Sequence, residues 1–123
     1  MAAAPVVHFE ITGKDGKKLQ SFYSKLFDWQ INADNPMNYG LVNAAGNGME
    51  VGKGSIGGGV AAAQEGAPAS VTFYVQVPDL DTALKKVASM GGKTLVPPTE
   101  IPNMVTFAMF QDPEGNAVGL VKG

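Results

Sequence analysis

The chain has 123 residues, a usual length for one domain and enough to bury a core without covalent cross-links. It has no cysteine, which excludes disulfides and thiolate chemistry and suits a cytoplasmic location. The net charge is −2 and no basic cluster occurs, so we expect no nucleic-acid partner. No apolar run is long enough for a membrane helix and the start shows no signal-peptide pattern, so we expect no membrane partner.

The first half of the chain reads as a strand, a helix and three strands. Residues 6–11 are rich in β-branched and aromatic side chains and predict a strand, and Asp15 is a suitable N-cap for the helix that follows. The apolar stripe of that helix has the spacing of an amphipathic helix: Leu19, Phe22, Tyr23, Leu26 and Phe27. Asp28 and Trp29 end it. Short strands are expected at residues 30–33 and 39–43, with a turn at Asn35-Pro36.

A glycine-rich stretch, residues 44–59, separates these strands from the fourth. Residues 56–63 predict that fourth strand, although it contains the glycines at 57–59. Such glycines relieve a bend in a sheet or admit a ligand close to the backbone, and the bend is the favoured interpretation.

The second half repeats the pattern. Residues 71–77 predict a strand, Asp79 an N-cap and Gly91-Gly92 the end of the second helix. Its stripe is Leu80, Ala83, Leu84, Val87 and Ala88. Three strands follow, at 94–96, 105–110 and 117–121, joined by Pro97-Pro98 and by a turn over 112–116 in which Gly115 or Asn116 takes a positive φ.

This internal repeat decides the predicted fold class. We expect α+β architecture: two βαβββ modules, residues 5–64 and 69–123, in a single domain spanning 1–123. The modules would form a cupped, mainly antiparallel mixed sheet with the helices outside. The two helical stripes are 61 positions apart and the leading strands about 64, which predicts a slightly longer strand-to-helix loop in the first module.

Alternation along the two leading strands predicts which side chains face the cup. In the first strand His8 and Glu10 face inward; in the second, Thr72, Tyr74 and Gln76 do. The outward residues of the second strand are expected to pack under its helix: Val71, Phe73, Val75 and Val77. Buried polar groups are costly unless paired, so two polar inner faces indicate a ligand, water or metal in the cup.

Each candidate residue also has an ordinary structural interpretation. His8, the only histidine, is a general base or ligand contact, or a hydrogen-bonded structural residue. Glu10 is a general base, a group that orients His8, or a solvated rim residue. Tyr74 stacks on a ligand ring or walls the core. Trp29 is expected in the core or an interface.

Two further residues, Phe107 and Met109, share a strand face and could line an apolar pocket. The candidate ligand-binding set is therefore His8, Glu10, Thr72, Tyr74, Phe107 and Met109, with His8 and Glu10 as the candidate catalytic pair. No nucleophile elbow, phosphate loop or dinucleotide fingerprint occurs.

The sequence resembles the vicinal oxygen chelate superfamily, also called the glyoxalase/bleomycin-resistance/dioxygenase family. The likeness covers nearly the whole chain. Its carriers are the His8 strand, the helix ending in residues 20–29, the segment 77–84, Gly91-Gly92 and the turn 110–116. The family fold is paired βαβββ modules around a cup, which agrees with the repeat.

The resemblance implies a site for a divalent metal, held by four His, Gln or Glu ligands from the first and last strands of both modules. His8 matches the first of these positions. The other positions correspond to Thr72, Gly119 and the glycines at 58 and 59, so His8 is the only ligand retained. We therefore expect no cofactor, with a divalent metal as the alternative.

Two function classes follow. The first is a small-molecule-binding protein of the bleomycin-resistance type with a degenerate metal site. The second is a lyase, isomerase or dioxygenase-type enzyme, either with a rearranged metal site that includes Glu50 or with His8 and Glu10 as a metal-free acid/base pair. The resemblance also implies a homodimer. A structural or interaction protein is a third class, for which the sequence offers no motif.

Overall fold

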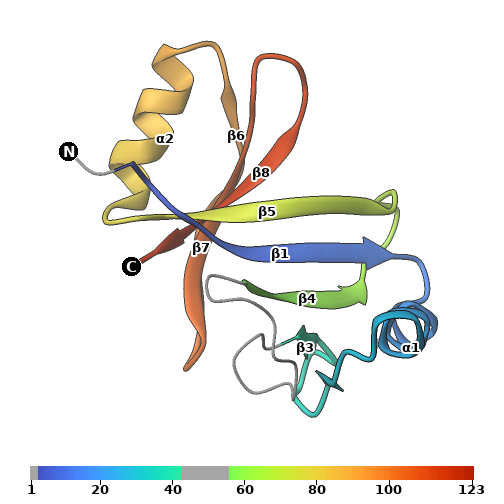
Figure 1. The fold of residues 1–123 in the computed structure, drawn as a ribbon. Helices are drawn as coiled ribbons and strands as arrows, with labels where there is room; N and C mark the ends of the chain where they lie inside the picture. The colour runs from blue at the N-terminus through green and yellow to red at the C-terminus, as the bar shows by residue number, and fades with distance from the viewer. Residues whose placement is uncertain (1–2, 43–55) are drawn as a thin grey trace. The chain divides into compact units, whose positions relative to one another are not determined.

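The computed structural model describes residues 3–42 and 56–123 (Figure 1). The chain divides into two compact units. The N-terminal unit is His8–Val71, and the C-terminal unit is Thr72–Gly123 together with Met1–Val7. The first residues join the C-terminal unit through a hydrogen bond from Gln76 N to Pro5 O of 2.9 Å.

The first five elements follow the order strand, helix, three strands: β1 (Val6–Gly13), α1 (Gly16–Phe27), β2 (Ile31–Asn32), β3 (Gly40–Val42) and β4 (Gly57–Ala62). In the N-terminal unit the strands run in the order β2-β3-β4-β1. β1 and β4 are parallel, with His8 beside Gly57 and Glu10 beside Gly59, and the other pairs are antiparallel.

The last five elements have the same order: β5 (Ser70–Val77), α2 (Leu80–Ser89), β6 (Lys93–Ile101), β7 (Val105–Gln111) and β8 (Ala117–Lys122). In the C-terminal unit the strand order is β5-β8-β7-β6, with β5 parallel to β8 and the remaining pairs antiparallel. The predicted α+β class, with two βαβββ modules and mixed strand pairing, is confirmed.

Both helices begin in the same way. Asp15 and Asp79 have extended backbones, and each carboxylate accepts a hydrogen bond from the amide three residues later. The caps lie 64 positions apart, as the leading strands do, so the predicted longer loop in the first module is wrong. Neither helix in the described part of the chain is long and apolar enough to cross a membrane.

This common start changes which helical residues correspond. Leu80 and Leu84 are buried in the core of the C-terminal unit with Ala108 and Leu120. Their counterparts in α1 are Gly16 and Gln20, and no residue of α1 is buried. The predicted offset of 61 residues matched the apolar stripes of the two helices. The helix caps are 64 residues apart, so the two stripes lie on different faces of their helices when counted from the caps.

The helix α1 instead lies close to β4 through small and polar contacts. A Cβ on Gly16 would come within 2.5 Å of Ala62 N, so only glycine allows this approach. The Gln20 amide donates to Val60 O at 2.8 Å and to Asn38 O at 3.1 Å.

Two expectations for the strands need correction. β6 continues through Pro97-Pro98, which we expected to be a connection, with register shifts between Thr94 and Thr99. Proline is tolerated because β6 is the outermost strand of its unit. The chain turns instead after Ile101, where Asn103 has a φ of 62°.

The outward face of β5 is only partly covered. Val75 and Val77 pack against the apolar cluster beneath α2, as expected. Val71 and Phe73 do not, and are 74% and 42% exposed. Because α2 starts directly after β5, it covers the C-terminal half of the strand and leaves the N-terminal half open.

The turn before β8 has the predicted form. Gly115 takes the positive φ, at 95°. The Asp112 carboxylate accepts hydrogen bonds from Glu114 N, Asn116 N and the Asn116 side chain. These bonds, the side-chain bond from Asn116 first, lower the pKa of Asp112.

Candidate functional site

The strand β1 presents two different faces. Phe9 points toward an aromatic cluster, with its ring centroid 5.4 Å from that of Trp29, which in turn contacts Tyr23 and Phe27. His8 and Glu10 lie on the opposite face by strand alternation. Trp29 therefore serves packing in this unit.

A tyrosine joins His8 to Glu10. The Tyr39 hydroxyl lies 2.9 Å from His8 Nε2 and donates to Glu10 Oε2 at 2.9 Å. The phenol has one proton, and an ionised carboxylate only accepts. The proton on His8 Nε2 is therefore the one that bonds the phenol oxygen, and the three side chains form a directed chain from imidazole to phenol to carboxylate.

The backbone of Tyr39 is fixed by one side chain. Asn35 Oδ1 accepts from Tyr39 N at 2.9 Å, and Asn35 Nδ2 donates to Tyr39 O at 2.7 Å. The preceding residue, Asn38, has a φ of 52°, a conformation that asparagine tolerates better than most residues. The polar turn before β3 thus holds the backbone from which the Tyr39 ring extends.

The glycines of β4 make room for aromatic rings on both faces. A Cβ on Gly59 would overlap the Tyr39 ring, and a Cβ on Gly58 would overlap the Phe9 ring. The Tyr39 and His8 rings are nearly parallel, at 16°, with centroids 6.2 Å apart. The structure thus gives Gly58 and Gly59 a packing reason, the close approach of aromatic rings, and the bend that we favoured stays a prediction.

Burial sets the charge of His8. It lowers the pKa of the imidazole below 6.5, and the negative charge of Glu10 partly opposes this effect. The lowered pKa favours the neutral imidazole. The hydrogen-bond chain needs only a proton on Nε2, which the neutral and the charged ring can both carry.

The candidates of the C-terminal unit are engaged in packing within it. Thr72 donates through Oγ1 to Ala117 O at 2.7 Å. Tyr74 is 7% exposed and its ring lies over Gly119, where any Cβ would overlap it. It meets the Phe107 ring edge-on, with centroids 6.5 Å apart.

The remaining apolar candidate lies nearby. Met109 pairs with Gly119 across β7 and β8 and is half-buried, as Phe107 is. Tyr74, Phe107 and Met109 therefore gather around the Gly119 position of the C-terminal unit.

The donor set does not fit the divalent metal that the resemblance implies. Among residues 3–42 and 56–123, no group of three or more His, Asp or Glu side chains could hold an ion. His8 and Glu10 are joined through the Tyr39 hydroxyl, and Gly59 and Gly119 are covered by tyrosine rings. Glu50, the carboxylate considered for a rearranged site, lies outside the described residues.

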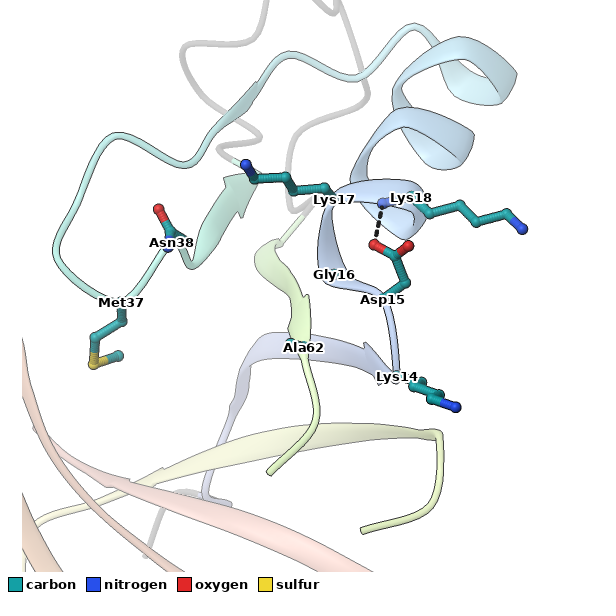
Figure 2. Close-up of a pocket in the computed structure, with 8 residues that line it drawn as sticks. All are labelled: Lys14, Asp15, Gly16, Lys17, Lys18, Met37, Asn38 and Ala62. Carbon is teal, nitrogen blue, oxygen red and sulfur yellow. Dashed lines mark hydrogen bonds between the residues drawn. The ribbon is translucent and has the colours of Figure 1, made fainter. Parts of the chain in front are cut away.

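A surface depression of about 570 Å³ lies elsewhere, at the start of α1 (Figure 2). Figure 2 shows the Lys14, Lys17 and Lys18 side chains pointing in different directions, with Asp15 bonded to the amide of Lys18. The cations do not converge, and none of the candidate residues lines this depression. The polar chain on β1 is therefore the better candidate site.

Tyr39 is the site residue that the sequence analysis missed. It lies 31 positions from His8 and precedes a strand of three residues, so no periodicity places it. The one available signal was the glycine at 59 inside a strand, which needs a neighbour that approaches closely.

Sequence comparisons agree with the fold. A model of the Glyoxalase/Bleomycin resistance protein/Dioxygenase superfamily matches residues 6–120. Proteins named "Putative glyoxylase CFP32" from Mycobacterium bovis and Mycobacterium tuberculosis are 33% identical over 109 residues. The match covers 86% of this chain and 41% of those proteins, so the chain spans less than half of their length.

Solved structures share the fold at low sequence identity. A glyoxalase/bleomycin resistance protein/dioxygenase superfamily member from Vibrio splendidus matches with a TM-score of 0.61 and 17% identity, over 98% of this chain and 100% of that one. Methylmalonyl-CoA epimerase from Mycobacterium tuberculosis matches with a TM-score of 0.64 and 16% identity, over 99% and 91%. At these identities the likeness carries the fold alone.

Proposed function

Since this chain belongs to the glyoxalase/bleomycin resistance protein/dioxygenase superfamily, we propose that it binds a small organic molecule without a divalent metal. His8, Tyr39 and Glu10 supply the polar contacts. For the C-terminal unit, taken by itself, we propose Tyr74, Phe107 and Met109 as apolar ligand contacts and Thr72 as a polar one.

One observation supports this proposal above the others. The Tyr39 hydroxyl bonds both His8 and Glu10, so the two polar residues of β1 form a preorganised hydrogen-bonding group. Because these protein side chains are already ordered, binding a ligand costs little further conformational entropy of the protein, which favours affinity.

A single histidine makes the experiment direct, since its ring ¹H and ¹⁵N signals need no assignment by mutation. These signals would be followed while a fragment library and, separately, methylmalonyl-CoA are added in the presence of EDTA. We expect at least one compound to shift them saturably. If none does, or if purified protein holds one divalent ion per chain through His8, the proposal is overturned.

A second candidate function is metal-free acid/base catalysis. The specific observation in its favour is the directed chain from His8 to Glu10, because the neutral imidazole that a lowered pKa favours has a free lone pair to act as a base. Two names suggest substrates: the relatives are called glyoxylases, and the epimerase acts on methylmalonyl-CoA.

The catalytic candidate predicts proton exchange at the ligand. Deuterium uptake from solvent into methylmalonyl-CoA would be measured with EDTA present for the wild type, His8→Gln and the exposed-helix control Ser21→Ala. Loss of uptake only in His8→Gln, with an unchanged urea midpoint, would support catalysis. No uptake in the wild type would remove epimerase-type chemistry on this substrate.

We further propose a cytoplasmic homodimer. Three apolar side chains of α1, Phe22, Leu26 and Phe27, are 50–56% exposed, and the absence of cysteine suits a reducing compartment. Light scattering after size exclusion would give twice the mass of 12.8 kDa. A monomer at all concentrations would contradict the dimer.

A further inference from the structure

The centre of the N-terminal unit has an unusual arrangement of donors. His8 Nε2 and Glu10 Oε2 come from residues two apart on one strand, and both bond a single atom, the Tyr39 hydroxyl oxygen, at 2.9 Å. An imidazole nitrogen and a carboxylate oxygen directed at one point are a common beginning of a metal site, where both would lie about 2.0–2.2 Å from the ion. Here that point is held by a phenol.

The phenol and a side chain at position 59 exclude each other. Gly59 pairs with Glu10 in the parallel ladder, so a side chain there would project on the face of Glu10. A Cβ at this position would overlap the hydroxyl and ring of Tyr39. A carboxylate on β4 and a tyrosine at position 39 therefore cannot both occupy this space.

The C-terminal unit repeats the same exclusion. Tyr74 lies 64 positions after Glu10 and pairs with Gly119 as Glu10 pairs with Gly59. A Cβ on Gly119 would overlap the Tyr74 ring. Equivalent strand positions of the two units are thus both glycine, and both are covered by a tyrosine ring.

We propose that Tyr39 takes the place of a divalent cation in this protein. Its hydroxyl links His8 to Glu10 as an ion would, and the absence of a side chain at Gly59 leaves room for its ring. The Asn35 clamp on the Tyr39 backbone keeps the phenol in place, so a cation that used both donor atoms would have to displace a fixed side chain. This inference rests on the metal-free site proposed above.

The inference predicts that a metal site can be created by removing the Tyr39 ring and adding a carboxylate at position 59. Tyr39→Ala with Gly59→Glu removes the ring and adds a third ligand beside His8 and Glu10. We expect this double variant to bind one Zn²⁺ about tenfold or more tightly than the wild type, in line with the cost of losing ligand support in metal sites. Added Co²⁺ should then broaden the His8 ring signals.

The matched control is Tyr74→Ala with Gly119→Glu, which makes the same change in the unit without a histidine. It should not gain Zn²⁺. Calorimetric titration with ZnSO₄ and the His8 signals would be recorded for all three proteins. Equal Zn²⁺ affinity of the wild type and the Tyr39→Ala/Gly59→Glu variant, or equal gain in the control, would overturn the inference.

If the double variant does not fold, the single variant Tyr39→Phe still tests the inference. This change removes only the hydroxyl, so the His8 Nε2 proton should move in chemical shift and exchange faster with water. An unchanged proton would show that the phenol does not hold His8. Fragment binding by the wild type in EDTA is a separate readout. If the wild type binds no fragment but the Tyr39 variants behave as expected, the proposed function is contradicted and this inference is not. If the wild type binds a fragment but the Tyr39 variants do not behave as expected, only this inference is contradicted.

Discussion

The two units are built on one plan and use their helices differently. Leu80 and Leu84 of α2 are buried among apolar residues, whereas Gly16 and Gln20 stand at the same places in α1. On the strands the contrast is similar, since the position of Glu10 in the N-terminal unit holds Tyr74 in the C-terminal unit. The comparison teaches that one copy of a repeated module can pack its helix on buried leucines while the other uses a glycine and a glutamine at the same places.

The largest expected difference between the units is in the helices. Leu84→Ala should lower the free energy of unfolding by about 2–5 kcal/mol, as buried leucine truncations do. The equivalent Gln20→Ala should cost about 1 kcal/mol, because it removes hydrogen bonds rather than core volume. Urea unfolding followed by circular dichroism measures both, and equal losses would contradict the contrast.

The glycines sharpen the comparison at the strands. Gly59→Ala and Gly119→Ala each force a tyrosine ring to move, so each should cost about 1–3 kcal/mol, as overpacked cores do. Gly59→Ala should change the His8 ring signals, because the Tyr39 ring that it displaces bonds His8. If Gly59→Ala leaves the His8 signals unchanged, the Tyr39 ring does not hold His8.

The N-terminal unit holds the only histidine of the sequence, so it should give the pH effect just below pH 6.5. The pKa of His8 is lowered by burial, so between that pKa and about 6.5 the unfolded chain binds more protons than the folded one. Stability should therefore rise with pH through this window and level off above it. Urea midpoints at stepped pH would show the slope, and His8→Gln should reduce it; an unaltered slope would contradict the assignment.

The smallest effect concerns the helix starts that the units share. Hydrogen bonding, first from the Thr82 amide, lowers the pKa of Asp79 below 3.8. The charged cap therefore stabilises the fold above pH 3.8, and this contribution is lost as pH falls through the lowered pKa. Asp79→Asn keeps a capping oxygen but should flatten this acid decline. The same decline in Asp79→Asn would rule out the cap as its source.

Local patterns predicted most of the fold. Strand alternation, helix periodicity and the aspartate caps gave the elements, because each depends on neighbours in the sequence. Pro97-Pro98 misled the strand prediction, since the position of β6 at the end of its unit is a tertiary property. The stripe offset misled the module alignment, because the two helices bury different faces.

The candidate site was predictable only in part. His8 and Glu10 follow from alternation along one strand. Tyr39 does not, because its place depends on a turn held by Asn35 and on space above Gly59, both of which are long-range or side-chain features. A glycine within a strand is thus worth examining for the ring that it admits.

The prolines of β6 have a consequence for contacts between molecules. Two successive residues without amide protons interrupt the outer row of hydrogen-bond donors on the last strand of the C-terminal unit. A strand from another copy could not pair continuously along this border, which guards against open-ended aggregation. Any dimer of this chain would accordingly have to form through side-chain surfaces or through a different strand.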